Sequence, residues 1–443
     1  MTRNVHLCAS ILFLLAAALS PTARAVPSYA RALGAPCATC HTLFPQLNAF
    51  GRQFKLSGYT LGAAASSEQG KQGEAGDNSE SLDALPALSV MLQAAYTSLQ
   101  QPLPDNQNNS GQLPQEASLF FAGRIAPGLG SFVQLTYSQA DGQIALDNAE
   151  LRYARQGKLG NTPVSYGVVL NNNPTLEDLW SSTPVWGFPW AAPDVGPEPS
   201  ASPLIEEALA QDVIGVGGYA SFGGKLYAAT TLYRSAHVGS NTPGPDSENT
   251  IDNAAIYWRV AWQFLKGSHS LEIGGYGLSA NLVPHGVGGP TDGYDDVAVD
   301  FQYEQTIGMR NLVVHGSYVD ENQNLTASSL AGTVGRSGYD LSLLKLDAGL
   351  YGSKLSYVLG HRQGHGDLDN LRFAAEPVTG SASGKPDSSA WIAEVIYSPW
   401  RNVQLRAQYT AYTQFNGASH NYDGFGRDAS DNNTLFFNAW FVW

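Results

Sequence analysis

Polar and apolar positions alternate through most of the chain from residue 85 onward. In one such segment, apolar and polar side chains take turns along Val403, Gln404, Leu405, Arg406, Ala407, Gln408, Tyr409 and Thr410. A period of two is that of a β-strand, whose successive side chains point to opposite faces. Charged residues on one face are tolerated where that face meets water, and they are excluded where it meets lipid. Such segments therefore predict strands with one apolar and one polar face.

About sixteen segments of this kind recur, and an even number is the rule for bacterial outer-membrane barrels. We predict strands near 86–98, 115–126, 129–139, 142–156, 162–171, 211–222, 224–235, 251–265, 267–278, 293–307, 310–321, 337–350, 352–363, 386–399, 402–414 and 431–443. Short turns between them mostly alternate with long loops, at 172–210, 236–250, 279–292, 322–336, 364–385 and 415–430. The pattern predicts an all-β, antiparallel outer-membrane barrel over 85–443. A soluble array of β-sandwiches is the alternative, but it does not require this asymmetry.

Composition agrees with a barrel in a membrane. The chain has 21 Tyr, 17 Phe, 9 Trp and 47 Gly, and only 14% of its residues are charged. It contains no run of about 20 apolar residues that would make a membrane helix. The last strand, 435–443, ends on the aromatic Trp443 with Phe441, Ala439, Phe437 and Leu435 on one face. That ending is typical of the terminal strand of an outer-membrane barrel.

The N-terminal residues 1–25 read as a secretory signal peptide. Arg3 supplies a positive start, an apolar stretch follows over 11–19, and Ala23-Arg24-Ala25 is a cleavage motif. Removal of this segment leaves two cysteines, Cys37 and Cys40. We therefore expect export from the cytoplasm and no disulfide framework.

The two remaining cysteines form the motif Cys37-Ala38-Thr39-Cys40-His41. C-x-x-C-H is the attachment pattern of a c-type haem, with both thiols bonded to the haem and the histidine as an axial ligand of its iron. A zinc site is the alternative reading, but it would need further ligands and the chain has no other cysteine after export. The motif predicts one covalently bound haem c.

Residues 26–62 form a small segment around this motif, and we expect it to be mostly helical. An apolar repeat at i, i+4, i+7 and i+11 marks one helical face that would cover the haem: Leu43, Leu47, Phe50 and Phe54. The segment has no second ligand for the iron. Met91 is a candidate from the first strand because its parity points it into the lumen, with His315 and Met309 as competitors, although a filler side chain is the simpler reading of Met91.

A flexible linker over 63–84, rich in Gly, Ser, Ala and Gln, joins the haem segment to the barrel. The segment 26–62 carries Arg31, Arg52 and Lys55 and no acid, whereas the whole chain has a net charge of −14. The barrel is therefore acidic, which attracts cations, favours docking of the basic segment and argues against nucleic acid as a partner.

The order of these parts resembles the fused monohaem cytochrome–porins of the bacterial outer membrane, a family that includes iron oxidases. The resemblance rests on the C-x-x-C-H motif, on the runs 44–55 (FPQLNAFGRQFK) and 58–60 (GYT), and on 171–180 (NNNPTLEDLW) with 185–189 (VWGFP). It implies electron transfer from extracellular Fe(II), or another reduced metal, through the haem to a periplasmic electron carrier such as a cytochrome. Activity as a ferrous iron oxidase follows from this resemblance and not from spacing or composition.

Two other functions stay open on the sequence. One is a cation-selective porin in which the haem segment acts as a sensor or plug, and the other is electron flow outward to an external acceptor. His361 and His365, with Asp367 and Asp369 nearby, could bind iron transiently, but two solvated loop histidines are the simpler interpretation. No motif for hydrolytic chemistry is present.

Overall fold

The computed structural model describes residues 28–33, 35–61, 87–104, 110–207, 209–236, 250–284 and 289–443. The predicted signal peptide (1–25) and linker (63–84) lie outside these residues. Among them, no helix is both long enough and apolar enough to cross a bilayer.

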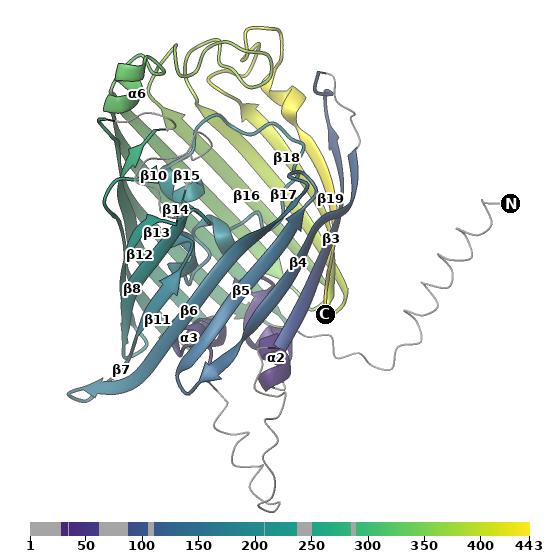
Figure 1. Ribbon diagram of the computed structural model, residues 1–443. Coiled ribbons are helices and arrows are strands. Elements are labelled where there is room, and N and C mark those ends of the chain that lie inside the picture. The colour runs from purple at the N-terminus through teal and green to yellow at the C-terminus, as the bar shows by residue number, and fades with distance from the viewer. Residues whose placement is uncertain are drawn as a thin grey trace, which may run out of the picture.

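Antiparallel strands build more than half of the described chain (Figure 1). The long strands are β3 (Ala87–Leu99), β4 (Ser110–Ala126), β5 (Leu129–Ser138), β6 (Gln143–Leu159), β7 (Thr162–Asn171), β8 (Val213–Phe222), β9 (Leu226–Ser235), β11 (Ala255–Lys266), β12 (His269–Val283), β13 (Asp292–Ile307), β14 (Arg310–Leu325), β15 (Gly338–Tyr351), β16 (Leu355–Gly366), β17 (Ser388–Trp400), β18 (Val403–Gln414) and β19 (Thr434–Val442).

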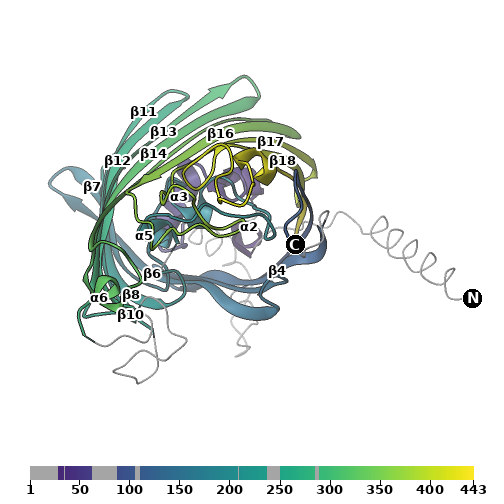
Figure 2. The same ribbon diagram turned by 90° about the horizontal axis from the view of Figure 1, so that it is seen from above.

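These strands close into a ring of sixteen in the described chain. Each strand pairs with its neighbour in sequence, β9 pairs with β11, and the last strand β19 pairs with the first strand β3, where Phe437 lies opposite Tyr96. The two-residue strand β10 (Thr250–Ile251) pairs with β12 beside β11. Viewed from above, the ring encloses short helices (Figure 2). The predicted all-β barrel of about 16 strands is confirmed.

The two faces of the strands differ as the alternation predicts. On β13, Val297 and Val299 are 56% and 60% exposed and lie on the outside. Asp300, the next residue along the strand, lies on the inside and is 4% exposed. Many outward side chains around the ring are large and apolar, and inward ones are largely polar. An apolar outside around a polar inside is the arrangement of a barrel that spans a lipid bilayer.

The two ends of the barrel differ in the length of their connections. One end, here the turn end, has tight links such as those at 127–128, 308–309 and 401–402; the other, the loop end, carries the long connections. The predicted strand 251–265 is divided because Asn253 adopts a left-handed φ of 65°, a conformation that asparagine tolerates better than most residues. Strand β14 runs to Leu325, and the helix α6 (Thr326–Ala331) follows in the predicted loop.

The connection 172–210 was expected to be an outer loop, but it folds into the lumen. It contains the short 3-10 helices η3 (Pro174–Glu177) and η4 (Pro184–Trp186) and the helix α5 (Leu204–Glu207). Leu176, Leu179 and Trp180 are buried there. Backbone amides of Leu204 and Ile205 donate hydrogen bonds to the inward carboxylates of Glu321 and Asp296. Polar inward side chains thus hold a loop inside the barrel, a contact between distant residues that strand periodicity does not reveal.

The haem-motif segment combines helices with a small hairpin. Its elements are α2 (Ser28–Leu33), the 3-10 helix η1 (Cys37–Thr39), the paired strands β1 (His41–Leu43) and β2 (Gln46–Leu47), and α3 (Ala49–Leu56). The helix predicted to include Leu43 begins only at Ala49. Pro45 cannot donate in a helix interior, and the Asn48 side chain caps α3 by accepting a hydrogen bond from Gly51 N at 3.0 Å.

Candidate functional site

The haem-motif segment lies inside the barrel at its turn end (Figures 1 and 2). Gly58 marks the contact: it has a φ of 66°, and a Cβ there would approach the carbonyl oxygen of Gly128, in a tight turn, to 2.5 Å. Any residue larger than glycine at Gly58 would therefore separate the segment from that turn.

Helix α3 packs directly on the loop that carries the cysteines. A Cβ at Gly51 would come within 2.1 Å of the Cys40 carbonyl oxygen, so only glycine permits this approach. The backbone N–H of Asn48 donates to the same carbonyl at 2.9 Å, and the backbone N–H of Thr39 donates to the Pro36 carbonyl oxygen at 2.9 Å. The motif is therefore held as a compact unit by backbone contacts.

A cavity of about 1010 Å³ opens beside the motif. We name it the haem-motif cavity, and its lining includes Tyr29, Cys37, Cys40, His41, Phe44, Leu47, Phe54, Lys55, Tyr59, Phe120, Phe132, Leu176 and Trp186. Its wall is mainly apolar and aromatic, as the walls of small-molecule and cofactor sites are. Both cysteines and the histidine of the motif thus face one cavity.

His41 is arranged as a metal-ligating histidine usually is. Its Nδ1 lies 3.0 Å from the carbonyl oxygen of Pro45, and a ligand histidine commonly donates one ring N–H to such a carbonyl while the other nitrogen binds the metal. Burial lowers the pKa of His41 to about 4, against backbone hydrogen bonds from Pro45 and Gln46 that raise it. The imidazole is therefore neutral at physiological pH, the form that ligates iron.

The two cysteines are free thiols and partly exposed. Burial raises the pKa of each thiol, and the neighbouring Cys37 raises that of Cys40 further. In the described chain, no group of three or more His, Cys, Asp and Glu side chains is placed to hold a metal ion. The two thiols, the neutral histidine and the apolar wall fit a haem attached through both cysteines.

The predicted cover residues separate into two groups. Leu47 and Phe54 line the haem-motif cavity. Leu43 is buried against strand side chains that include Val313 and Tyr351, and Phe50 is 43% exposed. The four residues do not share one face because the hairpin at residues 41–47 interrupts the helical repeat.

Of the aromatic residues in the cavity wall, only Phe54 was predicted to cover the haem; Tyr29, Tyr59 and Phe132 are among those that were not. Tyr29 and Tyr59 stack with centroids 5.1 Å apart, and Phe54 packs edge-on against Tyr29 at 5.1 Å. Phe132 of β5 completes the wall from the barrel. Tyr59 belongs to the family-like run 58–60, but its role depends on a partner distant in sequence.

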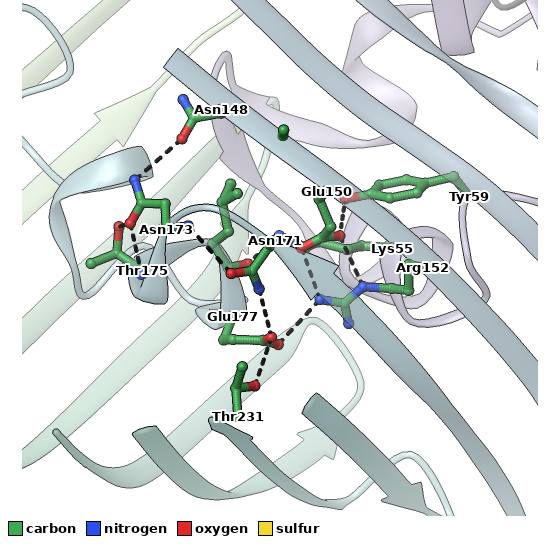
Figure 3. A network of polar contacts seen from close by, with 12 residues as sticks. Lys55, Tyr59, Asn148, Glu150, Arg152, Asn171, Asn173, Thr175, Glu177 and Thr231 are labelled. Atoms are coloured by element: carbon green, nitrogen blue, oxygen red, sulfur yellow. Dashed lines mark hydrogen bonds and ion pairs between the residues drawn. The ribbon is translucent and has the colours of Figure 1, made fainter. Parts of the chain in front are cut away.

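That partner is part of a buried network that anchors the segment (Figure 3). Tyr59 Oη donates to Glu150 Oε1 at 2.6 Å, and Lys55 Nζ lies 3.7 Å from Glu150 Oε2. Arg152 Nε lies 2.9 Å from Glu150 Oε1, and its Nη2 lies 3.3 Å from Glu177 Oε2. Two cations and two carboxylates balance, as buried charges require.

The network also gives the family-like run 171–180 a physical role. Glu177 accepts hydrogen bonds from Asn171 at 2.9 Å and Thr231 at 3.1 Å, and the Leu176 carbonyl accepts one from Lys55 at 2.5 Å. Leu176 also lines the haem-motif cavity. The inward loop is therefore part of the site that holds the segment. We name this site the socket, and its residues are Glu150, Arg152, Leu176 and Glu177.

Further contacts fix the opposite side of the segment. Arg52 Nη1 lies 2.6 Å from Glu304 Oε1 of β13. Gln46 Nε2 lies 2.9 Å from His315 Nε2, and His315 Nδ1 lies 2.9 Å from Asp347 Oδ2. Opposite charges on segment and barrel meet here, as the basic segment and acidic barrel led us to expect.

Met91, the candidate sixth ligand, points into the lumen and is 3% exposed. It packs with Phe120 and Trp440, and Phe44 lies against that cluster. Met91 is absent from the wall of the haem-motif cavity, so iron ligation by Met91 stays a prediction. Of its competitors, His315 is engaged by Asp347, and Met309 is 96% exposed in a turn.

The loop-end histidines lie apart from the motif. The His361 ring packs at a tilt against Trp391 with ring centroids 4.4 Å apart, and His365 Nε2 lies 2.9 Å from Gln363 Nε2. His365 Nδ1 lies 3.8 Å from Asp387 Oδ2. These contacts do not bring the two imidazoles together with Asp367 and Asp369.

A second lumen cavity, of about 1020 Å³, adjoins the first, and we name it the acidic cavity. Its wall includes Glu116, Asp147 and Glu206, and it shares Phe44, Pro45, Phe120 and Trp186 with the haem-motif cavity. Phe44 lies 5.1 Å from the His41 ring, measured between centroids. Carboxylates in the lumen therefore lie along a cavity that reaches the wall beside the motif histidine.

Comparisons with known proteins bear on the fold alone. No protein-family model and no curated protein matches the chain. Among solved structures, the chain is similar to the OmpF of Salmonella typhi in complex with daunomycin, at 13% identity and a TM-score of 0.47, over 81% of this chain and 97% of that one. It is also similar to the anion-selective porin from Comamonas acidovorans, at 11% identity and a TM-score of 0.47, over 81% and 99%.

Proposed function

We propose that this protein is an outer-membrane electron-transfer protein that takes electrons from extracellular Fe(II), or another reduced metal, through one c-type haem and passes them to a periplasmic carrier. The observation that carries the proposal is that Cys37, Cys40 and His41 face one apolar cavity. The apolar outside of the barrel, its aromatic last strand and the signal-like N-terminus support the outer membrane as its location.

Each residue has a role in this proposal. The thiols of Cys37 and Cys40 would hold the haem, and Nε2 of His41 would ligate its iron while Nδ1 stays on the Pro45 carbonyl. A haem supplies reversible one-electron chemistry when bound. Leu47, Phe54 and the aromatic wall keep water from its site, which is one of the means by which a protein sets a redox potential.

The lumen supports a donor that arrives from the loop end. Carboxylates exposed at the loop end attract Fe(II) to that end. The acidic cavity then continues to the wall that it shares with the haem-motif cavity. The segment's position at the turn end, which faces the periplasm in outer-membrane barrels, favours an acceptor there. Electron flow outward would use the same parts in reverse and is the competing direction.

A second candidate is a cation-selective porin in which the haem segment is a plug or sensor. The closed barrel and the carboxylates of its lumen favour this function independently of any haem. The inward loop and the segment occupy much of the lumen, so the two candidates differ in what passes through it: electrons and a metal ion, or solutes in bulk.

Two measurements separate the candidates. A pyridine haemochrome assay on the protein from the outer-membrane fraction should give one haem c per chain. In liposomes that hold the protein, Fe(II) added to the loop side should reduce the haem, as seen in its absorption spectrum. Solute-driven swelling without haem reduction would support the porin, and absence of covalent haem would reject the electron-transfer function.

A further inference from the structure

Basic side chains gather at the turn end of the barrel. Eight lysines and arginines are exposed in or beside the short turns, and together we name them the basic rim: Arg124, Arg155, Lys158, Lys225, Lys266, Arg310, Lys354 and Arg401. The described turns 124–130, 155–164, 222–227, 264–269, 306–311, 351–356 and 399–404 contain no acidic side chain. Within the described chain, none of the eight takes part in an ion pair with a carboxylate. The rim is therefore a positive surface without internal compensation.

The loop end has the opposite character. Exposed acids there include Asp141, Asp212, Asp252, Asp295, Asp320, Asp340 and Glu376, against the exposed arginines Arg234 and Arg336. Arg336 is further neutralised by Asp367 at 3.0 Å. A chain with a net charge of −14 thus presents a local positive patch at one end only, which overall charge does not predict.

Part of the rim borders the haem motif. Cys37 and Phe44 share a small opening of about 340 Å³ with Arg401 and Asn402 in the turn between β17 and β18. The positive charge of Arg401 acts on the Cys37 thiol and lowers its pKa, against the larger effect of burial. The attachment point of the proposed haem is therefore close to the surface at this turn.

Arg310 and Lys354 extend the same side of the rim. Lys354 O accepts a hydrogen bond from Ser398 N at 2.8 Å, which places that turn beside β17. A Cβ at Gly352 would lie 3.9 Å from Arg310 Cγ, so the two turns adjoin. Three consecutive turns thus present positive charge, and the one that bears Arg401 borders the opening to Cys37.

We propose that this part of the basic rim, Arg310, Lys354 and Arg401, is the docking surface for a soluble one-electron carrier with an acidic face. Complementary charge raises the association rate of two proteins and orients them before contact. The carrier is reduced by one electron as the haem iron is oxidised by one, with no proton transferred. The inference rests on the proposed function and adds to it the site and the chemistry of the partner.

A charge-matched pair of carriers tests the proposal. The probes are mitochondrial cytochrome c, which is basic, and its succinylated derivative, which keeps the haem but is acidic. The full-length protein in nanodiscs is reduced, mixed with either oxidised probe, and the second-order rate constant is followed by absorbance in stopped flow. We expect the acidic probe to react at least tenfold faster at low salt and to lose this advantage at high salt.

The rim is then reversed in the triple variant Arg310→Glu, Lys354→Glu and Arg401→Glu. We expect the preference for the acidic probe to disappear or reverse, while Arg234→Glu with Arg336→Glu at the loop end leaves it unchanged. A preference for the basic probe in the wild type, or an unchanged preference in the rim variant, would overturn the inference. If the variant instead changes only retention in anionic lipid, the rim contacts headgroups and the inference also falls.

Two controls keep this result separate from the proposed function. Haem staining and reduction by Fe(II) are measured on the wild type and on every variant. If the wild type shows neither, the proposed function itself is rejected. Binding of the acidic probe to immobilised nanodiscs is measured without electron transfer. Normal haem reduction together with rim-independent binding would reject the docking surface alone.

Discussion

The loop end of the barrel exposes mainly carboxylates, whereas the turn end exposes lysine and arginine among its charged side chains. The ends also differ in construction. Long connections cover the loop end, and one of them, 172–210, folds inward. At the turn end the links are short, and the haem-motif segment is held in the lumen beside them through contacts such as that of Gly58 with Gly128.

This difference favours different partners for the two ends in the proposed function. A negative end attracts a metal cation, and a positive end repels it while attracting an acidic protein. The motif itself has no direction, since a haem can gain or lose an electron from either side. In the proposed conduit, the charges that surround the two openings and the placement of the segment near one of them favour access of the metal donor at the loop end and of the carrier at the turn end.

The largest effect is expected from the motif at the turn end. Cys37→Ala and Cys40→Ala each remove one of the two thiols, so normal double attachment of haem should be lost in both. Haem-stained denaturing gels measure it, with Thr39→Ala inside the same motif as the matched control. Full covalent staining in both cysteine variants would contradict haem attachment through this motif, and the two ends would then differ in charge and construction alone.

The next effect concerns the socket that holds the segment at that end. Lys55→Met leaves the carboxylates of Glu150 and Glu177 with Arg152 as their only cation in the described network (Figure 3). Breaking a buried ion pair by removing one partner costs about 3–5 kcal/mol. We expect the segment to detach, as measured by limited proteolysis of the folded barrel from the turn side.

The matched control for that variant restores the balance of charge. Lys55→Met with Glu150→Gln leaves Arg152 against Glu177, and a glutamine at 150 can still accept from Tyr59. Protection of the segment should return in large part. If the double variant is cleaved as readily as the single one, lost packing of the Lys55 side chain, and not unpaired charge, controls the docking.

The acids of the loop end are expected to have a moderate effect. Replacing Asp252, Asp320, Asp340 and Glu376 by their amides should raise the Fe(II) concentration for half-maximal haem reduction by roughly 3–10-fold at low salt, within the range of electrostatic steering. At about 0.5 M salt the effect should largely vanish because exposed charges are screened. Neutralising Lys158, Lys225 and Lys266 at the turn end is the control. A comparable change of opposite sign in that control, a fall in the Fe(II) concentration for half-maximal reduction, would mean that net charge, and not the end that bears it, controls access.

The strands of the barrel could be predicted from the sequence because their side chains obey a local rule. Val297 and Val299 face lipid and Asp300 faces the lumen, and that alternation requires no knowledge of distant residues. The motif could be predicted for the same reason, since Cys37, Cys40 and His41 are adjacent. The inward loop and the socket could not. Glu150 pairs with Lys55 and Tyr59, about ninety residues earlier in the chain, and no short pattern indicates which inward carboxylate will meet them.

The helix in the segment illustrates a second limit. The spacing of Leu43, Leu47, Phe50 and Phe54 is helical, but Pro45 and the Asn48 cap shift the start of the helix to Ala49. An apolar repeat states which face a helix would have, and residues that block or cap it decide whether the helix forms there. The turn-end rim escaped prediction for a third reason, because its residues are scattered through the chain and meet only when the barrel closes.

The smallest effect is expected at the loop end, from a single carboxylate that orders two loops. Asp369 accepts hydrogen bonds from the backbone amides of Gly335 at 2.8 Å, Leu371 at 2.9 Å and Arg372 at 3.1 Å. Burial raises the pKa of the Asp369 carboxyl, but these and other backbone hydrogen bonds hold that pKa below its usual value. A depressed pKa means that the carboxylate stabilises these loops fully above its unfolded pKa of about 4, and that the contribution is lost as the pH falls through the folded pKa.

Asp369→Ala should therefore speed amide hydrogen exchange in 333–337 and 369–373 at pH 7, by roughly tenfold if one to two kcal/mol of hydrogen bonding is lost. Exchange in the barrel strands should not change, and Asp367→Ala, whose side chain lies at the surface with Arg336, is the neighbouring control. After correction for the intrinsic effect of pH on exchange, wild type and Asp369→Ala should converge once the pH has fallen below the lowered pKa of the folded Asp369 carboxyl. Equal exchange at pH 7 would show that the loop end is ordered without this carboxylate, and that its acids serve the charge of that end alone.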